Sequence, residues 1–359
     1  MRAASLAFVL ATACAPVPTT FPSTAAPDAV AETAADVVPV VDAQGEADDA
    51  AVHDTAESTI DAPADVGADI YVDAAADSVA KPHLDAATLS LTLQHGAFPP
   101  TADHPSAVAH IPPGFDPTPP LNLVVYLHGW NNCALNVAGA VDSSCNPQAG
   151  TPIRPASHLL EQFDAAKRNA LLLIPEVKFD AASGDPGALG KSGGFAAMLT
   201  EVLKQLAPQL GQISLQQLGQ VVVFSHSGAY QPAAAMATAG GVPLTEIALL
   251  DSLYGQQAAF QAWIQEDITG FALPTPKRRF ASVYTQDGGT LSNNHAFATA
   301  AAKWLASEPD TLLDDHTSTT WPPASYQHGV LFKYSALTHH GVTLYYFGQL
   351  LKNGGLPTL

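Results

Sequence analysis

The sequence predicts an α/β fold in which a mostly parallel central β-sheet carries helices on both faces, preceded by a disordered N-terminal tether. Three observations predict it: continuous apolar runs bounded by turn residues, helical patterns between those runs, and an acidic N-terminal segment with few large apolar side chains. Continuous apolar runs are typical of parallel strands buried on both faces. Strands that alternate with helices indicate crossover connections between neighbouring parallel strands.

The first 14 residues, MRAASLAFVLATAC, have the layout of an export signal. Arg2 supplies a positive start, residues 6–10 are apolar, and small residues precede Cys14. The segment resembles a bacterial lipoprotein signal, in which the cysteine is lipidated and becomes the new N-terminus. This resemblance implies a signal peptide over residues 1–13, lipidation of Cys14, and an exported protein that is anchored to a membrane and faces the periplasm or the cell surface.

An acidic segment follows the signal. The chain of 359 residues has a formal net charge of −19, from 33 acidic and 14 basic residues, and residues 15–86 hold 15 of the acidic residues but only one basic residue, Lys81. Few large apolar side chains and many like charges cannot offset the entropy lost on ordering, so residues 14–86 are expected to be a disordered linker. The acidic surplus also argues against a nucleic-acid partner.

Residues 87–359 are expected to form one α/β domain. The first two expected strands alternate apolar and polar residues, and the later ones are continuously apolar. Strands are expected over residues 88–93, 106–111, 121–127, 170–174, 220–224, 247–250, 280–284 and 330–334. The clearest helix covers 195–206, where apolar residues recur at the spacing of one helix face. Further helices are expected over 230–239, 258–264 and 342–351.

A candidate nucleophile, Ser227, lies in a sharp turn between an expected strand and an expected helix. Small residues stand two positions before it (Ser225) and two positions after it (Ala229), as a strained strand-to-helix turn requires. Ser225 fits this context less well, because Val223 lies two positions before it. The pattern departs from the usual G-x-S-x-G motif at both glycine positions. The turn also places a helix N-terminus under the reacting oxygen, which favours developing negative charge.

The strand over 121–127 ends in His128-Gly129-Trp130, and AVAHIPPGF precedes it. With Ser227 after the next expected turn, these motifs resemble the α/β-hydrolase family over roughly residues 88–355. The resemblance implies a serine hydrolase that cleaves an ester, or less readily an amide, without a cofactor. It also implies an oxyanion hole made of backbone N–H groups. When the family's positions are carried over to this sequence, these N–H groups are those of Trp130 and His226.

The family order of nucleophile, acid and base implies the remaining catalytic residues. Asp287, in a Gly-rich turn after the strand over 280–284, is the preferred acid, and Asp251, after the strand over 247–250, is the alternative. The preferred base is His339, with His340 as its alternative, because both precede the expected C-terminal helix. Three other histidines are weaker candidates for the base: His295, His316 and His328.

The remaining cysteines, Cys133 and Cys145, are expected to pair, since export to an oxidising compartment permits a disulfide. The segment over 133–155 is long enough to cover a pocket. No H-x-x-x-H or H-x-H pair is found on an expected helix or strand, so no metal site is expected. The expected partner is a small-molecule or acyl substrate, and the expected membrane contact is the lipid anchor at Cys14.

A second hypothesis comes from a different functional class. The missing elbow glycines and the long tether would also suit a catalytically silent surface lipoprotein that resembles α/β-hydrolases and binds a ligand or an envelope component. The relative placement of Ser227, the two aspartates and the two adjacent histidines distinguishes these hypotheses, because catalysis requires nucleophile, base and acid to be in contact.

Overall fold

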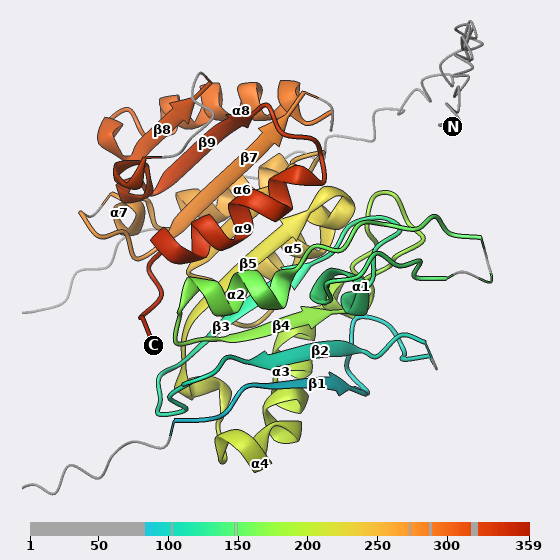
Figure 1. Ribbon diagram of the computed structural model, residues 1–359. Coiled ribbons are helices and arrows are strands. Elements are labelled where there is room, and N and C mark those ends of the chain that lie inside the picture. The colour runs from blue at the N-terminus through green and yellow to red at the C-terminus, as the bar shows by residue number, and fades with distance from the viewer. Residues whose placement is uncertain are drawn as a thin grey trace, which may run out of the picture. The chain divides into compact units, whose positions relative to one another are not determined.

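The computed structural model describes residues 83–359, except residues 102, 147, 149, 273, 287, 288 and 317–321 (Figure 1). The expected signal peptide, Cys14 and nearly all of the expected linker lie outside the described residues, and so does Asp287. Within the described part of the chain, no helix is long and apolar enough to cross a membrane.

A mixed nine-stranded sheet forms the centre of the described residues, in the order β1-β2-β4-β3-β5-β6-β7-β9-β8. Its strands are β1 (Ala87–Leu91), β2 (Ala107–Ile111), β3 (Leu121–Leu127), β4 (Leu171–Pro175), β5 (Leu218–His226), β6 (Glu246–Leu250), β7 (Arg279–Thr285), β8 (Leu312–Asp315) and β9 (Val330–Ser335). Strand β2 runs antiparallel to both of its neighbours, and the other adjacent pairs are parallel. The mostly parallel sheet confirms the expected fold class.

Helices cover both faces of this sheet (Figure 1). One face carries α1 (Ala134–Ala138), α2 (Leu159–Ala166) and α9 (Gly341–Asn353). The other face carries α3 (Gly194–Gln205), α4 (Ala207–Leu210), α5 (Tyr230–Ala239), α6 (Gln257–Gln265), α7 (Ile268–Phe271) and α8 (Leu291–Trp304). Short 3₁₀ helices cover Gly187–Gly190, Leu215–Gln217, Ser227–Ala229, Pro309–Thr311 and Pro323–Gln327.

Two apolar cores, one on each face, explain the continuous apolar runs of the sequence. In β3, Val124 and Tyr126 pack into the core under α2 and α9, while Leu123 and Val125 pack into the core under α3 and α5. Because successive side chains of a strand point to opposite faces, a strand with helices on both sides needs apolar residues at every position.

The edge strand β8 was not expected from the sequence, because it is short and half polar. Its Asp315 carboxylate forms an ion pair of 2.8 Å with the Nζ atom of the buried Lys333 on β9. This pairing lets a polar segment close one edge of the sheet. The strands β3, β5, β6, β7 and β9 are parallel, so their carboxyl ends meet at one edge, where open α/β sheets hold their ligands.

Candidate active site

Ser227 lies between the end of β5 and the start of α5, with a backbone φ of 56°. This left-handed conformation is uncommon for a residue other than glycine, and such strain concentrates at functional sites. Ser225 and Ala229 are both fully buried, so the small side chains on either side of the turn take the space that glycines would leave. The turn therefore has the predicted elbow geometry.

Gly129 lets the loop after β3 pass close to this turn. A Cβ atom on Gly129 would lie 2.6 Å from the Cβ atom of Ser227 and 3.0 Å from the carbonyl oxygen of His226. Beneath the turn, the Ser252 hydroxyl donates to the Ser227 carbonyl at 2.7 Å and accepts a hydrogen bond from the Ser225 hydroxyl at 2.9 Å. The loop above and the hydroxyl pair below fix the position of Ser227.

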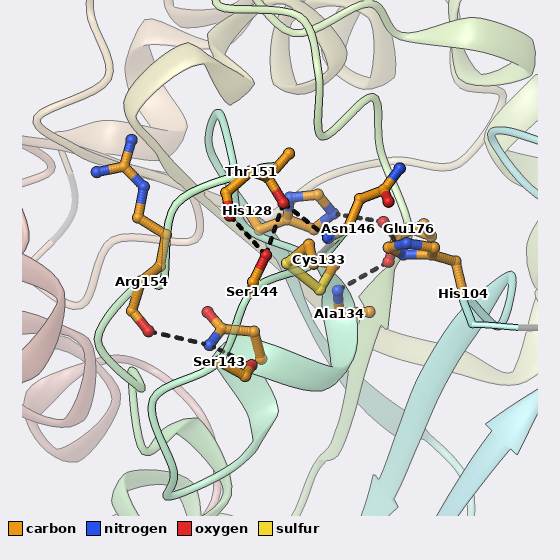
Figure 2. The surroundings of a disulfide bond; sticks show 12 residues. His104, His128, Cys133, Ala134, Ser143, Ser144, Asn146, Thr151, Arg154 and Glu176 are labelled. Atoms are coloured by element: carbon orange, nitrogen blue, oxygen red, sulfur yellow. Dashed lines mark hydrogen bonds and ion pairs between the residues drawn. A yellow bond between two sulfur atoms is a disulfide. The ribbon is translucent and has the colours of Figure 1, made fainter. Parts of the chain in front are cut away.

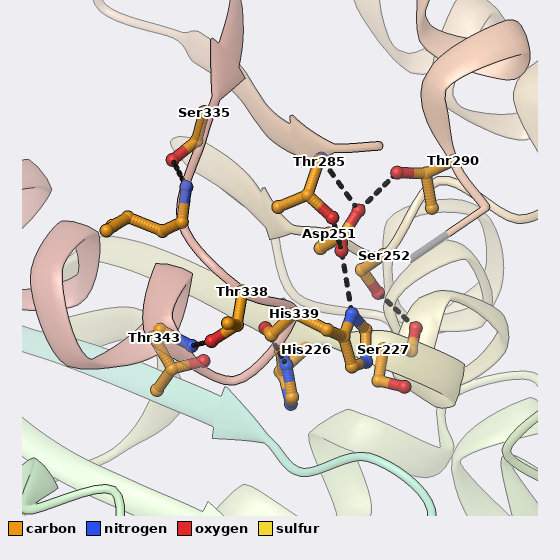
Figure 3. Close-up of polar contacts among 12 residues, drawn as sticks. His226, Ser227, Asp251, Ser252, Thr285, Thr290, Ser335, Thr338, His339 and Thr343 are labelled. Carbon is orange, nitrogen blue, oxygen red and sulfur yellow. Dashed lines mark hydrogen bonds and ion pairs between the residues drawn. The ribbon is translucent and has the colours of Figure 1, made fainter. Parts of the chain in front are cut away.

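Asp251 and His339 come together beside Ser227 (Figure 3). The His339 Nδ1 atom lies 2.7 Å from the Asp251 Oδ2 atom. An ionised carboxylate only accepts hydrogen bonds, so this contact places the proton on Nδ1 and leaves Nε2 as the basic nitrogen. The Asp251 side chain is fully buried, whereas about a third of the His339 side chain (32%) is exposed. His339 and Ser227 line the same cavity.

The surroundings of Asp251 keep it ionised. The Thr285 N–H donates to Oδ1 at 3.1 Å, the Thr285 hydroxyl donates to Oδ2 at 2.6 Å, and the Thr290 hydroxyl donates to Oδ1. Burial raises the pKa of Asp251, but the hydrogen bonds from His339, Thr285 and Thr290 outweigh it, and the net pKa lies below its ordinary value. Hydrogen bonds to the charged form have this effect.

The carboxylate that contacts His339 among the described residues is thus Asp251, the alternative acid in the sequence analysis. Asp287, the preferred acid, lies outside the described residues, between β7 and α8 in the sequence. Two described residues that flank it contribute to the site, because Thr285 at the end of β7 and Thr290 just before α8 both donate to Asp251. Position along the chain could not distinguish the two aspartates, since β6 and β7 are adjacent parallel strands that end at the same edge.

The structure separates the two adjacent histidines at the start of α9. The His340 Nε2 atom bonds the Ala156 carbonyl at 3.3 Å, and burial lowers the pKa of His340. The other candidate bases have partners away from Ser227. His316 pairs with the Asp314 carboxylate, and His328 hydrogen-bonds to the Asp310 carbonyl. His295 packs edge-on against His316. Among the described residues, only His339 combines a carboxylate partner with a place beside Ser227.

His226 supports the base. Its Nε2–H donates to the His339 carbonyl at 3.0 Å, and the two rings lie 4.6 Å apart between centroids. Burial, together with the neighbouring imidazole of His339, lowers the pKa of His226 to about 3. His226 is therefore neutral near pH 7 and holds the loop that carries His339.

The oxyanion assignment to His226 needs a correction. His226 precedes Ser227 and is the last residue of β5, whereas the N–H that follows the nucleophile belongs to Gly228, in the first turn after the strand. N–H groups at a helix start lack partners within the helix and remain free to bind an anion. Within the described part of the chain, the N–H groups of Gly228 and Trp130 donate no hydrogen bond to another residue.

Tyr254 was not singled out from the sequence, yet it lies beside the base. Its ring lies edge-on to His339, with centroids 6.5 Å apart. Burial and the charge of Asp251 raise the pKa of Tyr254 to about 12, so the hydroxyl keeps its proton. No pattern in the sequence marks Tyr254, because only the folded loop between β6 and α6 brings it to His339.

A second group of buried polar residues holds the loop after β3 (Figure 2). The His128 Nε2 atom accepts the Val177 N–H at 3.1 Å, and its Nδ1–H donates to the Gly129 carbonyl at 3.2 Å. Glu176 accepts the Ala134 N–H at 2.8 Å at the start of α1. Cys133 and Cys145 form a disulfide with Cα atoms 5.7 Å apart, which closes the adjoining loop.

A cavity of about 140 Å³ opens at this site. Its lining residues are Trp130, Asn132, Arg154, Pro155, His226, Ser227, His339 and His340. Pockets for drug-sized ligands measure roughly 300–1,000 Å³, so this cavity holds a small acyl or alcohol group. The segment over 133–155, expected to cover a pocket, contributes Arg154 and Pro155 to its wall.

Comparisons with known proteins find proteins that are similar to this chain in fold only. No protein-family model matches the sequence, and no curated protein matches it. A feruloyl esterase module from Clostridium thermocellum, complexed with sinapinate, is 10% identical, with a TM-score of 0.45 and coverage of 76% of this chain and 95% of that chain.

Two S-formylglutathione hydrolases are similarly distant. The enzyme from Staphylococcus aureus is 11% identical, with a TM-score of 0.41 and coverage of 76% and 95% of the two chains. The enzyme from Agrobacterium tumefaciens is 10% identical, with a TM-score of 0.39 and coverage of 75% and 92%. At such identities the similarity concerns the fold, and an assignment of activity depends on the site described above.

Proposed function

We propose that this chain is a serine hydrolase that cleaves a carboxylic ester with a small acyl or alcohol group. One observation carries the proposal: the hydrogen bond between the buried Asp251 and His339 Nδ1, beside a serine in a strained strand-to-helix turn. An acid that orients a histidine, and a histidine next to a serine in a cavity, together form the arrangement that activates a hydroxyl nucleophile.

In the proposed reaction, the Ser227 Oγ atom attacks the ester carbonyl while His339 Nε2 takes the hydroxyl proton. The resulting tetrahedral oxyanion accepts hydrogen bonds from the N–H groups of Trp130 and Gly228. The C–O bond of the ester then breaks, and His339 gives its proton to the leaving alcohol. A water molecule attacks the acyl-serine by the same route in reverse, with His339 as base, and releases the carboxylic acid and free Ser227.

Asp251 supports both proton transfers. Its charge stabilises the imidazolium that forms on His339, and its hydrogen bond holds the ring in the tautomer with Nε2 free. Thr285 and Thr290 donate hydrogen bonds to the Asp251 carboxylate and keep it ionised. The proton therefore stays on His339.

We also propose that the protein is exported and anchored through Cys14, as the lipoprotein-like signal implies. The disulfide between Cys133 and Cys145 suits an oxidising compartment. Replacement of Cys14 by Ser should release the protein from the membrane fraction of its host. Retention of that variant in the membrane fraction would argue against lipidation.

The test of the hydrolase proposal uses a fluorophosphonate probe and a chromogenic acetate ester. The wild-type protein should be labelled and should turn the ester over, and Ser227→Ala should abolish both signals. Ser192→Ala, which removes an exposed hydroxyl that does not line the cavity, is the control and should keep both signals. Absence of labelling and turnover in the wild-type protein would instead favour the silent binding protein, and labelling that persists in Ser227→Ala would exclude this nucleophile.

A further inference from the structure

The cavity beside Ser227 contains a positive charge that the proposed reaction does not use. Arg154 lines this cavity with the three histidines His226, His339 and His340. Burial lowers the pKa of His226 and of His340, so both are neutral near pH 7. No carboxylate among the described residues lies within 4.0 Å of the Arg154 guanidinium. Arg154 is thus the permanently charged cation among the residues that line the cavity, although the chain as a whole is acidic.

Arg154 differs in this respect from the other arginines that the structure describes. Each of the other three donates to a carbonyl or a carboxylate: Arg168 to the carbonyl of Leu356, Arg278 to Glu266, and Arg279 to the carbonyl of Asn353. The Arg154 side chain, in contrast, donates to none of the described residues, and its buried Nε atom has no hydrogen-bond partner, as is also true of the Nε atoms of Arg168 and Arg279. A guanidinium left without partners in a pocket is a donor set for a planar anion.

Asn132 adds a second unpartnered polar group to the same wall. Its residue exposure is 6%, and its Oδ1 atom is buried without a hydrogen-bond partner. Its Nδ2 group donates to no described residue, although the side chain lines the cavity. The Nδ2 group is therefore available to donate to an anion on the ligand, whereas the Oδ1 atom is an acceptor and would face away from a carboxylate.

The disulfide-bridged loop holds both residues in place. Asn132 directly precedes Cys133, and the Arg154 backbone exchanges hydrogen bonds of 2.8 and 3.1 Å with Ser143, inside the loop that Cys145 closes. The Asn136 amide also donates to the Arg154 carbonyl at 3.3 Å. Figure 2 shows the Arg154 side chain directed away from the disulfide. The backbone of Arg154 is therefore fixed while its guanidinium stays free for a ligand.

We propose that Arg154 and Asn132 bind a carboxylate carried by the ester substrate, so that the enzyme prefers anionic esters to neutral ones. This inference rests on the proposed hydrolase function. The guanidinium supplies two parallel N–H donors and the amide a third, which matches the geometry of a carboxylate. The exposed Trp130 ring on the same wall offers an apolar surface for the part of the substrate next to the carboxylate.

Matched ester pairs test the proposal. 4-Acetoxybenzoate and its methyl ester place the charge on the alcohol side, and the 4-nitrophenyl monoester of adipic acid and its methyl ester place it on the acyl side. In the pair whose charge lies on the side that reaches Arg154, wild-type kcat/KM should be about tenfold or more higher for the anionic ester than for the neutral ester. A factor of this size corresponds to one charge-assisted hydrogen bond. Arg154→Gln should bring this ratio to about one, because kcat/KM for the anionic ester falls more than kcat/KM for the neutral ester.

Further variants refine the test. Arg154→Lys should keep part of the preference, because it retains the charge but loses the planar fork. Asn132→Asp should weaken turnover of the anionic ester alone, since it faces the carboxylate with a like charge. Lys303→Gln, which removes an exposed positive charge in the last turn of α8, is the control for net charge and should keep the wild-type ratio. A wild-type protein without preference in either pair, or a preference that survives in Arg154→Gln, would overturn the proposal.

Binding to an inactive variant separates this proposal from the proposed function. Calorimetry with Ser227→Ala should show that 4-acetoxybenzoate binds and its methyl ester binds at least about tenfold more weakly, and Arg154→Gln should remove the difference. If the anion binds through Arg154 but the wild-type protein hydrolyses no ester, the hydrolase proposal fails and the anion site remains. If esters are hydrolysed but Ser227→Ala binds both compounds equally, only the anion site is wrong.

Discussion

Two pairs of a histidine and a buried carboxylate lie at the carboxyl edge of the sheet, and they differ in whether a ring nitrogen of the histidine stays free. In the first pair, His339 uses Nδ1 to bond Asp251 at 2.7 Å and keeps Nε2 for the cavity. In the second pair, both ring nitrogens of His128 bond backbone groups, and the Glu176 carboxylate lies 3.6 Å away. A nearby carboxylate does not make a histidine a base; a free ring nitrogen beside a nucleophile does.

The two carboxylates also differ in the groups that they bind. Asp251 receives hydrogen bonds from His339 and from two threonines, which keep it ionised to orient the imidazole. Glu176 receives the Ala134 N–H and forms an ion pair with His104 at 3.2 Å, so it fastens α1 and the loop before β2. The first pair is placed for proton transfer and the second for stability, and substitutions in the two should therefore have different effects.

Removal of the base should have the largest effect on activity. His339→Ala should lower kcat by about 10⁴-fold or more, because the serine loses its proton acceptor. His340→Ala should lower kcat by less than about tenfold, since this ring bonds the Ala156 carbonyl and lies beside the site without a carboxylate partner. Steady-state turnover of a chromogenic acetate ester measures both. The reverse order would assign the base to His340.

Crowding of the nucleophile should have the next largest effect. In Gly129→Ala the new methyl group would lie 2.6 Å from the Ser227 Cβ atom, so the serine or the loop after β3 must move. A displacement of about 1 Å in a catalytic group can reduce the rate by roughly 100-fold. We expect that loss in kcat while the secondary structure, measured by circular dichroism, stays intact. Unchanged kcat would show that the loop and the turn are less tightly packed than described.

Loss of the disulfide should affect stability more than chemistry. Cys133 and Cys145 are 12 positions apart, and closure of a loop of this size contributes roughly 3 kcal/mol in the chain-entropy model. The double variant Cys133→Ser/Cys145→Ser should unfold at a lower urea concentration and retain measurable turnover, because neither cysteine contacts the Ser227, His339 and Asp251 set. An unchanged unfolding midpoint would show that the bridge does not stabilise the loop.

The smallest predicted effect depends on pH. The Glu176 carboxylate, 3.2 Å from the Nδ1 atom of the buried His104, raises the pKa of His104 above its ordinary value. Such a group adds stability that is fully present below the unfolded-state pKa, about 6.5, and is lost as the pH rises through the higher folded-state pKa. The free energy of unfolding of wild type, minus that of His104→Gln, should therefore be larger at pH 5.5 than at pH 9. Denaturant titrations at both pH values measure it, and a larger difference at pH 9 would contradict the account.

The sequence predicted those parts of the fold that depend on local patterns. The continuous apolar runs at β3 to β7 and the helix Tyr230–Ala239 follow from buried strands and small residues around Ser227. Local sequence patterns could not distinguish Asp251 from Asp287 as the acid, because the two residues follow adjacent parallel strands. It depends on where the Thr285 and Thr290 hydroxyls point, and only the packed structure fixes that.

The site also contains residues that no motif could mark. Asn132 and Arg154 are 22 positions apart, and a disulfide-bridged loop brings them to one cavity. Tyr254 reaches His339 through the course of the loop after β6. The amide of Gly228, in contrast, could have been identified from the sequence, because it directly follows the nucleophile.

The most direct test of the central claim compares three carboxylates in one assay. Asp251→Asn should lower kcat for an acetate ester by about 10⁴-fold, because the amide favours the wrong imidazole tautomer. Glu176→Gln and Asp287→Asn should each lower kcat by less than about tenfold, with thermal unfolding used to verify that all three variants fold. Near-wild-type turnover by Asp251→Asn, together with a large loss in either other variant, would contradict the assignment of Asp251 as the residue that orients His339.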